Sequence, residues 1–168
     1  MTFQIRHPIV EGQFCSFNAD STEADSAAVQ AGRLVRIVGV TDDNRTEVDC
    51  VTDISAQTAF GWLMQKVKKE STEMAPNFRF ASDMGSSDAY LGDPVGVAHG
   101  PGAIYETDQY VDEGSDGITA GTLLYGDDDG KLSDTNADSS AVAHAIAMQT
   151  LTATETAAGV MLRIKALV

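Results

Sequence analysis

The fold class follows from the sequence LVRIVGV at residues 34–40 and the sequence TDDN that comes directly after it. Four of the seven residues in the first stretch are β-branched, and such residues favour the extended backbone of a strand. Clustered Asp and Asn residues favour a turn. The sequence EVDCV at residues 47–51 then alternates polar and apolar residues, the pattern of a half-buried strand. These residues predict two strands separated by a turn.

Strand-like segments recur through the rest of the chain. The longest are residues 60–68 and the apolar C-terminal residues 159–168, which we expect to lie in a sheet or an interface. Shorter strands are expected at residues 77–81, 95–98 and 103–106. Short strands separated by Gly and Pro are typical of a sandwich or a barrel. We therefore predict a mainly β, sandwich or barrel-like domain with few short helices, one of them within Asp20–Gln30.

The first 28 residues predict an extended N-terminal arm. Their large apolar residues are widely spaced among turn-forming residues such as Pro8, Gly12 and Asn18. Those apolar residues are Phe3, Ile5, Ile9, Phe14 and Phe17. They are too dispersed to form a core of their own, which favours an arm that becomes ordered only against a partner. Residues 29–168 are then expected to form the β-rich domain.

Two segments of this domain resemble each other. The sequence VQAGRLV at residues 29–35 is echoed by ITAGTLL at residues 118–124. Each is followed by a polar region and then by a strand that ends in Met-Gln. One explanation is an internal duplication of a turn–strand–loop–strand unit, covering 29–67 and 118–168 with residues 76–117 as an insert. The alternative is chance similarity between two strands.

The charge distribution argues against two classes of partner. The 168-residue chain has 25 acidic and 11 basic residues, a formal net charge of −14. Residues 81–162 hold fourteen Asp and Glu but a single basic residue, Lys131. Such a surface repels the phosphates of nucleic acids and of anionic membranes, and no apolar run approaches the ~20 residues of a membrane helix. We therefore expect no binding to nucleic acid or to a membrane.

The cysteines indicate a reducing compartment. Cys15 and Cys50 form no Cys-x-x-Cys motif, and the start of the chain shows no charged-then-apolar signal segment. We interpret both as small buried side chains of a protein made in the cytoplasm. A single disulfide between them is the alternative.

No pattern in the sequence predicts catalysis. The histidines His7, His99 and His144 lie in the arm, in a Gly-rich loop and in an alternating apolar strand, and none has the spacing of a metal-ligand pair. The sequence also lacks the Gly-x-Ser-x-Gly turn of a nucleophilic serine and the glycine-rich loops that hold nucleotides. We therefore predict that the protein is not an enzyme and has no catalytic residue.

The acidic sequence GDDDGKLSD at residues 126–134 could suggest a calcium site, since hard cations bind clustered carboxylates. It does not fit an EF-hand, because placing Gly130 at the invariant glycine puts Tyr125 at the first ligand position and Asn136 at the last. A hairpin with positive φ angles at Asp129 and Gly130 explains the same residues. We favour the hairpin, and we expect no cofactor and no metal requirement for folding.

Several short motifs together resemble the capsid decoration proteins of tailed bacteriophages, also called cement or head-stabilisation proteins. They are Ala31-Gly32-x-Leu34-Val35, the strand at 59–65, Ala120-Gly121-x-Leu123 leading into 141–149, and the apolar C-terminal strand. The resemblance implies a small, β-tulip-like domain that sits as a trimer on the outside of the virion shell. It also implies an arm that reaches onto the major capsid protein, and no enzyme activity.

The resemblance and the composition together give a set of expected contact residues. They are the apolar and basic side chains of the arm and of the strand near Lys66. Lysines at a strand edge also block unwanted sheet pairing. The candidates for contact with the major capsid protein or with another copy are Phe3, Ile5, Arg6, Ile9, Phe14, Phe17, Trp62, Lys66, Lys68 and Lys69.

Two other functions fit the same sequence. The first is a β-sandwich adhesion or carbohydrate-binding module, for which Tyr90, Tyr105 and Tyr110 would have to cluster on one exposed face. Buried tyrosines would instead favour the cementing role. The second is a calcium-stabilised binding domain centred on Asp127–Asp134.

Overall fold

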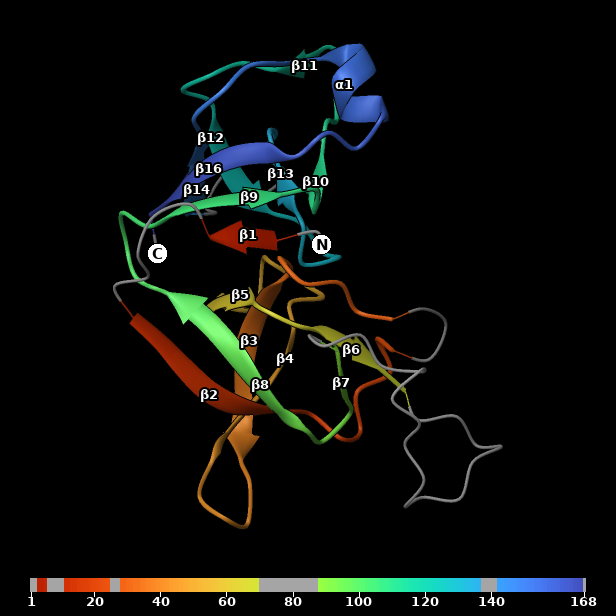
Figure 1. The fold of residues 1–168 in the computed structure, drawn as a ribbon, viewed down its shortest axis with the longest axis vertical. Helices are drawn as coiled ribbons and strands as arrows, with labels where there is room; N and C mark the ends of the chain where they lie inside the picture. The colour runs from red at the N-terminus through yellow and green to blue at the C-terminus, as the bar shows by residue number, and fades with distance from the viewer. Residues whose placement is uncertain (1–2, 6–10, 25–27, 70–87, 137–141, 168) are drawn as a thin grey trace.

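The computed structural model describes residues 3–5, 11–24, 28–69, 88–136 and 142–167. Strands dominate these residues, and the mainly β class predicted from the sequence is confirmed. The strands form two units stacked along the long axis of the molecule (Figure 1). The single helix of the described residues is α1 (Ala153–Ala157).

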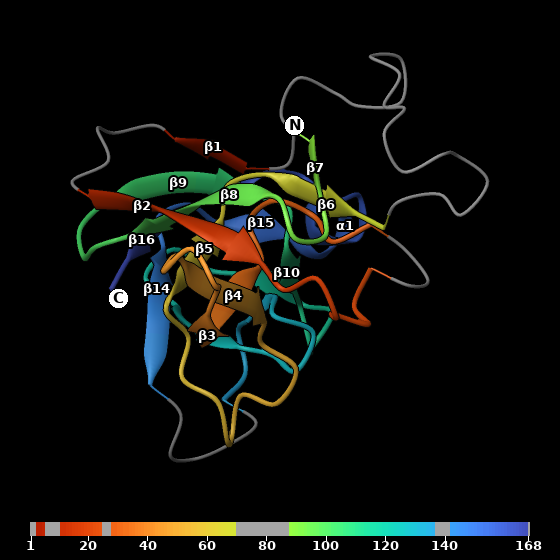
Figure 2. The same cartoon turned by 90° about the horizontal axis from the view of Figure 1, so that it is seen from below.

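The first unit is a closed five-stranded barrel with the order β2-β4-β3-β5-β8. Its strands are β2 (Glu11–Phe17), β3 (Leu34–Val40), β4 (Thr46–Cys50), β5 (Gly61–Leu63) and β8 (Pro94–His99). The barrel closes through β2, which is antiparallel to β8 and parallel to β4. Figure 2 views this barrel from the end that lies away from the second unit. A short parallel pair, β6 (Lys66–Lys68) and β7 (Asp88–Tyr90), lies beside it.

The second unit is a curled seven-stranded sheet with the order β1-β9-β16-β14-β12-β13-β10. Its strands are β1 (Phe3–Ile5), β9 (Ile104–Thr107), β10 (Tyr110–Val111), β12 (Leu123–Gly126), β13 (Leu132–Ser133), β14 (Ala143–Ala147) and β16 (Leu162–Ala166). The pair β11 (Gly117–Ile118) and β15 (Leu151–Thr152) lies with α1 at the end away from the barrel (Figure 1).

The second unit repeats the strand order of the barrel. Strands β13, β12, β14 and β16 follow one another as β4, β3, β5 and β8 do in the first unit. Strand β9 is antiparallel to β16, and β10 is parallel to β13. Together β9 and β10 therefore take the place of β2, with a break in the strand between them. The correspondence is wider than the sequence echo, since it includes strands before residues 29 and 118.

The two echoed Ala-Gly turns are built alike. Gly32 has a φ of 94° and donates its N–H to the carbonyl of Leu63 at 2.7 Å. Gly121 has a φ of 92° and donates its N–H to the carbonyl of Ala147 at 2.8 Å. Only glycine adopts such angles at little cost, so each turn leads directly into a strand, β3 or β12.

One apolar core spans the junction between the units. It includes Leu34, Trp62 and Ala98 of the barrel together with Tyr105 and Leu124 of the second unit. The rings of Trp62 and Tyr105 are both fully buried, with their centroids 5.6 Å apart. A second core lies inside the barrel. The shared core makes the two units one structural body, and we expect them to unfold together.

The short helix forms at a different place from the one predicted. The described residues of Asp20–Gln30, namely 20–24 and 28–30, contain no helix. The hydroxyl of Ser21 instead donates to the carboxylate of Asp49 at 2.6 Å, and the amide of Asn18 donates to the same group at 2.9 Å. Asp49 is buried and needs these donors. Ser21, which could have capped a helix, therefore forms a hydrogen bond to a residue of the barrel strand β4 instead.

Helix α1 begins with a capping box formed by Thr152 and Glu155. The side chain of Thr152 accepts from the N–H of Glu155, and the carboxylate of Glu155 accepts from the N–H of Thr152 at 2.8 Å. This reciprocal pair satisfies two backbone donors at the start of the helix.

The C-terminal strand lies in a sheet, as predicted. Strand β16 pairs with β14 on one side and with β9 on the other. Its alternate residues Leu162, Ile164 and Ala166 are fully buried.

The segment 1–28 contains two strands of the structure, because β1 pairs with β9 and β2 is part of the barrel wall.

Candidate interaction surface

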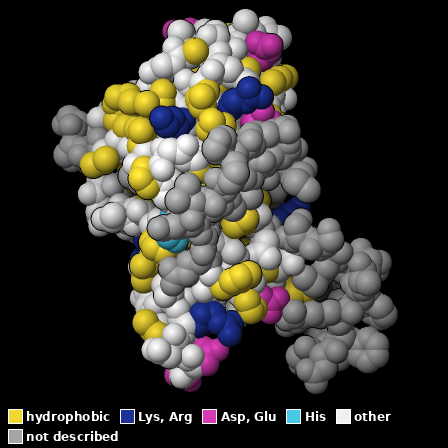
Figure 3. Space-filling model, turned by 60° about the vertical axis from the view of Figure 1, so that its left-hand side comes forward, with side chains coloured by type: hydrophobic (Ala, Val, Ile, Leu, Met, Phe, Trp, Pro, Cys, Tyr) yellow, Lys and Arg dark blue, Asp and Glu magenta, His cyan; other side chains and the backbone are white. Residues whose placement is uncertain are grey.

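Large apolar side chains are exposed on the outer wall of the barrel. Phe14 of β2 is 79% exposed, and Ile37 and Val40 of β3 are 51% and 64% exposed. Strand β4 lies between these two strands. Figure 3 shows one face of the molecule, on which hydrophobic side chains form several patches over both units. Phe14 thus lies two strands away from Ile37 and Val40 on the barrel wall, and exposed apolar side chains of this size are candidates for contact with another protein.

An open hollow of about 400 Å³ lies beside Ile37. Its walls come from β3, through Arg36 and Ile37, and from the loop at residues 56–60, through Gln57 and Phe60. The lining combines polar and apolar groups and includes no cluster of acids, histidines or cysteines. The hollow therefore continues the exposed surface of β3 with a mixed polar and apolar lining, and this lining offers no nucleophile–base pair.

The structure separates the contact residues predicted from the sequence into two groups. Phe14 is exposed, whereas Phe17 and Trp62 are fully buried. Phe17 packs inside the barrel and Trp62 in the junction core, since strand alternation turns both inward. These two side chains therefore serve the cores instead of a contact surface.

The three lysines lie on and just after β6. Lys66 and Lys68 are partly exposed in this strand, and Lys69 is exposed directly after it. Lys68 forms an ion pair with Asp88 of the neighbouring strand β7 at 2.5 Å.

Of the arm candidates, Phe3 and Ile5 belong to β1, and Arg6 and Ile9 lie outside the described residues.

The tyrosines do not form an exposed aromatic face. Tyr90 is 8% exposed and Tyr105 is fully buried. Tyr110 is partly buried, and its hydroxyl donates to the carbonyl of Val160 at 2.7 Å. Burial, followed by the nearby carboxylates of Asp108 and Asp112, raises the pKa of Tyr110 to about 12. This arrangement disagrees with a sugar-binding face built from the three tyrosines.

Residues 126–134 form the hairpin favoured from the sequence. Strands β12 and β13 pair antiparallel, and Gly130 donates its N–H to the carbonyl of Asp127 at 2.8 Å. Gly130 has a φ of 70°, but Asp129 does not have the positive φ that we predicted. The turn is therefore a type I turn followed by a left-handed glycine, a common connection between paired strands.

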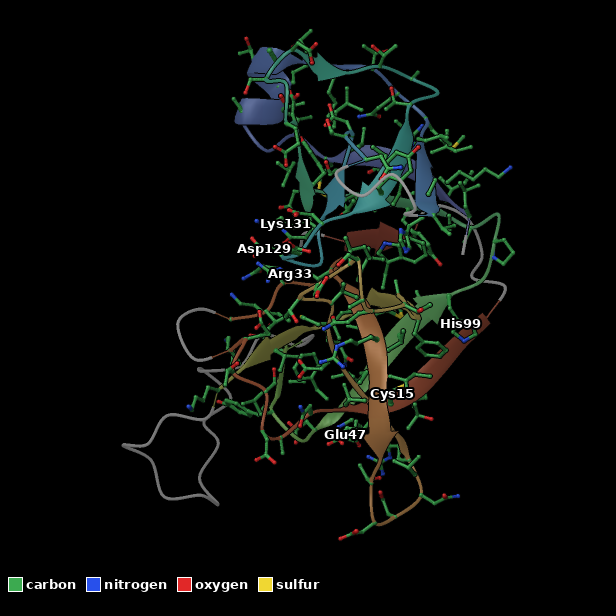
Figure 4. The ribbon with its side chains drawn as sticks, turned by 180° about the vertical axis from the view of Figure 1, so that it is seen from behind. Cys15, Arg33, Glu47, His99, Asp129 and Lys131 are labelled. Carbon is green, nitrogen blue, oxygen red and sulfur yellow. The ribbon has the colours of Figure 1, made fainter. Side chains whose placement is uncertain are left out.

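This turn also fastens the second unit to the barrel. The carbonyl of Gly130 accepts from the N–H of Leu34 at 2.6 Å, and the carboxylate of Asp128 accepts from the N–H of Ile54 at 3.1 Å. Figure 4 shows Asp129 and Lys131 at the junction, on the same side as Arg33. Asp128 of the hairpin thus has a structural role at the junction.

Replacing Gly130 with alanine is expected to destabilise the junction. A Cβ at this position would lie 3.0 Å from the carbonyl oxygen of Leu34 and 3.2 Å from that of Val51. Gly159 is a matched control, because its φ of 67° is nearly the same and no atom lies within 4 Å of its would-be Cβ. Both substitutions place alanine in the left-handed region, which costs about 1–2 kcal/mol.

We expect Gly130→Ala to lower the free energy of unfolding by about 1 kcal/mol more than Gly159→Ala does, because only the first adds a steric conflict. Urea unfolding of both variants measures the difference. Equal losses would mean that the turn is not tightly seated on the barrel.

Three carboxylates of the second unit lie close together. Ligand oxygens of Asp112, Asp116 and Asp134 are within 4.8 Å of one another, an arrangement that could hold a cation. Asp112 already accepts from the N–H of Gly117 at 2.9 Å and from the hydroxyl of Thr156 at 2.6 Å. These bonds, both made by Oδ2 of Asp112, tie β11 and α1 to the loop after β10.

The cysteines are free thiols in the described structure. Cys15 and Cys50 are both fully buried in the barrel core. Burial raises the pKa of both, that of Cys50 to about 12. Because the thiolate is the reactive form, neither group is suited to nucleophilic chemistry at neutral pH.

His144 is buried in strand β14 of the second unit. It is 6% exposed, and its Nδ1 has no hydrogen-bond partner among the described residues. His99 lies in the barrel, with its ring centroid 5.2 Å from that of Phe60, and His7 lies outside the described residues. The two described histidines thus belong to different units.

Among the described residues, no helix has the length and apolar character needed to span a membrane.

We expect the stability of the protein to fall as the pH drops below about 6.5. Burial lowers the pKa of His144 in the folded state. In this range the unfolded chain takes up a proton that the folded protein does not, so acid favours unfolding. His144→Leu should flatten the decrease between pH 7.5 and 5.5, because leucine has no proton to gain.

Urea unfolding at four or five pH values measures this effect. The carboxylates of Asp53 and Glu155 have pKa values below their ordinary range, because hydrogen bonds stabilise the charged form, so they titrate below this window. Parallel pH profiles of the wild type and His144→Leu would exclude His144 as the source.

The chain shows structural similarity to a phage protein. A solved structure of the head fiber gp8.5 N base in bacteriophage phi29 matches 93% of this chain and 92% of its own length. The TM-score is 0.48 and the sequence identity is 16%. No protein-family model matches the chain, and no curated protein matches its sequence.

Proposed function

We propose that this chain is a structural virion protein that binds the outside of an assembled phage capsid and stabilises it by cementing neighbouring subunits. It catalyses no reaction. The observation that carries this proposal is the exposure of Phe14, Ile37 and Val40 on the barrel wall. Fully burying a side chain of this size contributes about 1.5–3 kcal/mol. Such contacts, repeated over a symmetric shell, add up through multivalency.

The partners in this proposal are the major capsid protein and other copies of the chain, with a trimer as the expected assembly. The barrel faces the shell through Phe14 and the Lys66–Lys69 edge. The arm residues Phe3, Ile5, Arg6 and Ile9 extend the contact. The end of the second unit that lies away from the barrel, with β11, β15 and α1, faces outward, where the like charges of its acidic residues keep particles apart. A ligand that binds only the assembled shell shifts the equilibrium toward it.

The proposal is tested by adding the purified protein to expanded shells assembled from the major capsid protein of the same genome. We expect the protein to sediment with the shells and to raise the temperature at which they break open. Phe14→Ser should weaken binding, and its fold should be unaffected because the side chain is largely in water. Val142→Ser is the control, since Val142 is 68% exposed on the second unit.

The arm needs a deletion that ends before Glu11, because Glu11–Phe17 is a barrel strand. Removing residues 1–10 should weaken binding to the shells while the barrel still melts cooperatively. If the full-length chain neither sediments with the shells nor protects them against heat, the cementing role is wrong.

A further inference from the structure

The two units carry the same turn at the same place in their strand order. The hairpin of β3 and β4 turns at Thr41–Arg45, and the hairpin of β12 and β13 turns at Asp127–Lys131. In each, the N–H of the first residue donates to the carbonyl of the fifth, at 2.8 Å and 2.9 Å. The fourth residue of each turn is left-handed, with φ of 61° at Asn44 and 70° at Gly130.

The side chains of the two turns also correspond. The third residue is an aspartate that forms an ion pair with the fifth, Asp43 with Arg45 at 2.9 Å and Asp129 with Lys131 at 3.1 Å. The second residue is an aspartate in both turns, Asp42 and Asp128. The sequences TDDNR and DDDGK therefore build one turn twice.

The second copy of this turn is seated on a protein surface, which is the end of the barrel. It receives a backbone N–H at the carbonyl of its fourth residue and another at the carboxylate of its second, from Leu34 and Ile54. The residue just before it, Gly126, is packed so tightly that an added Cβ would lie 2.6 Å from Cδ1 of Ile54. The surface thus offers two amide donors and an apolar side chain.

The first copy of the turn stands at the opposite end of the molecule, away from the second unit (Figure 1). Asp42, Asp43 and Asn44 are exposed. Val40, which precedes the turn as Gly126 precedes the other, is 64% exposed. Arg45 holds the turn in place by donating to the hydroxyl of Ser16 at 3.3 Å. A turn that binds protein in one unit is therefore presented to solvent in the other.

We propose that the Thr41–Arg45 turn and Val40 seat the barrel on the major capsid protein, an inference that rests on the proposed function. The junction between the two units of this molecule shows the chemistry of that contact. The capsid surface offers one backbone N–H to the carbonyl of Asn44, a second to the carboxylate of Asp42, and an apolar side chain to Val40. In this chain the same combination comes from the N–H of Leu34 at the start of β3 and from the N–H and side chain of Ile54 in the loop after β4.

A second copy of the chain fits this turn less well. Its barrel end is already covered by its own Asp127–Lys131 turn. The corresponding end of its second unit follows β13 and carries the cluster of Asp112, Asp116 and Asp134. Those carboxylates would repel Asp42 and Asp43. The charge distribution therefore favours a different, less acidic protein as the partner.

The test uses the shells described above and two substitutions in the full chain, Val40→Asp and Asp42→Lys. Each removes one contact of the turn, and we expect each to weaken binding to the shells about tenfold or more. Val142→Asp and Asp20→Lys are the controls, because Val142 is equally exposed and Asp20 is exposed elsewhere on the barrel. Thermal unfolding of all four variants checks that each is folded.

The outcomes separate this inference from the proposed function. If the wild type does not bind the shells, the proposed function is wrong and this inference falls with it. If the wild type binds and the two turn variants bind equally well, the cementing role stands and the turn is not its contact. If the turn variants instead dissociate an oligomer of the free protein in sedimentation velocity, the partner is a second copy, which also overturns the inference.

Discussion

Replacing Trp62 with alanine is expected to lower the free energy of unfolding by about 3–5 kcal/mol. Trp62 is fully buried in β5, opposite Leu34 of β3, and its ring lies 5.6 Å from that of Tyr105 in the second unit. Removing the indole leaves a cavity where the two units meet. The loss therefore weakens the barrel, the second unit and the contact between them at the same time.

Urea unfolding followed by far-ultraviolet circular dichroism measures this loss, since Trp62 is the only tryptophan and its fluorescence disappears with it. Trp62→Phe is the matched variant. Its cost should be smaller, because phenylalanine refills much of the volume, and the Nε1 of Trp62 has no hydrogen-bond partner among the described residues to lose. Both variants should still unfold in one transition. A loss below about 1 kcal/mol for Trp62→Ala, or two separate transitions, would contradict a shared core.

The strands that the sequence predicted are those whose local pattern agrees with their packing. Strand β3 matches the predicted LVRIVGV stretch residue for residue, and β4 differs from its prediction by one residue at each end. The sequence also predicted strand β16, because its apolar residues Leu162, Ile164 and Ala166 alternate with the charged residues Arg163 and Lys165. In each case the hydrophobic pattern has a period of two and needs no distant information.

Strand β2 could not be recognised in this way. Its sequence EGQFCSF has a glycine, no β-branched residue and a large apolar residue, Phe14, that faces solvent. Its order depends on pairing with β8, some eighty residues later in the chain, and with β4. Such long-range pairing leaves little local signal, and the same residues therefore resembled an arm.

The candidate surface was only partly accessible from the sequence. The acidic hairpin at residues 126–134 and the echo between residues 29–35 and 118–124 were visible in the sequence, but the correspondence of TDDNR with DDDGK was not. The segment between the Ala-Gly turn and the hairpin turn is shorter in the second unit. The residue numbers of Gly121 and Asp127 differ by six, whereas those of Gly32 and Thr41 differ by nine. That difference shifts the alignment, and only the hydrogen bonds of the two turns restore it. Which turn is seated and which is exposed depends on how the units stack.

The packing around Gly61 distinguishes the barrel from the second unit. Counting back from the Met-Gln pairs, Gly61 in β5 corresponds to Ala145 in β14. By the echo alone, alanine would be acceptable at residue 61. In the barrel, however, a Cβ on Gly61 would lie 2.5 Å from the carbonyl oxygen of Ala98 and 2.8 Å from Cγ1 of Val97. Strand β8 would have to move away, which disturbs the barrel wall.

We expect Gly61→Ala to lower the free energy of unfolding by about 1–3 kcal/mol, the usual cost of overpacking. Gly39→Ala is the matched control in β3, because its would-be Cβ meets only the flexible carboxylate of Glu47, at 3.5 Å. That change should be neutral or stabilise by up to about 1 kcal/mol, since alanine restricts the unfolded chain more than glycine does. Urea unfolding of the two variants at pH 7 gives the comparison. If the two variants were equally stable, β5 and β8 would not be packed as closely around Gly61 as the structure shows. Alanine would then be as acceptable at residue 61 in the barrel as it is at residue 145 in the second unit.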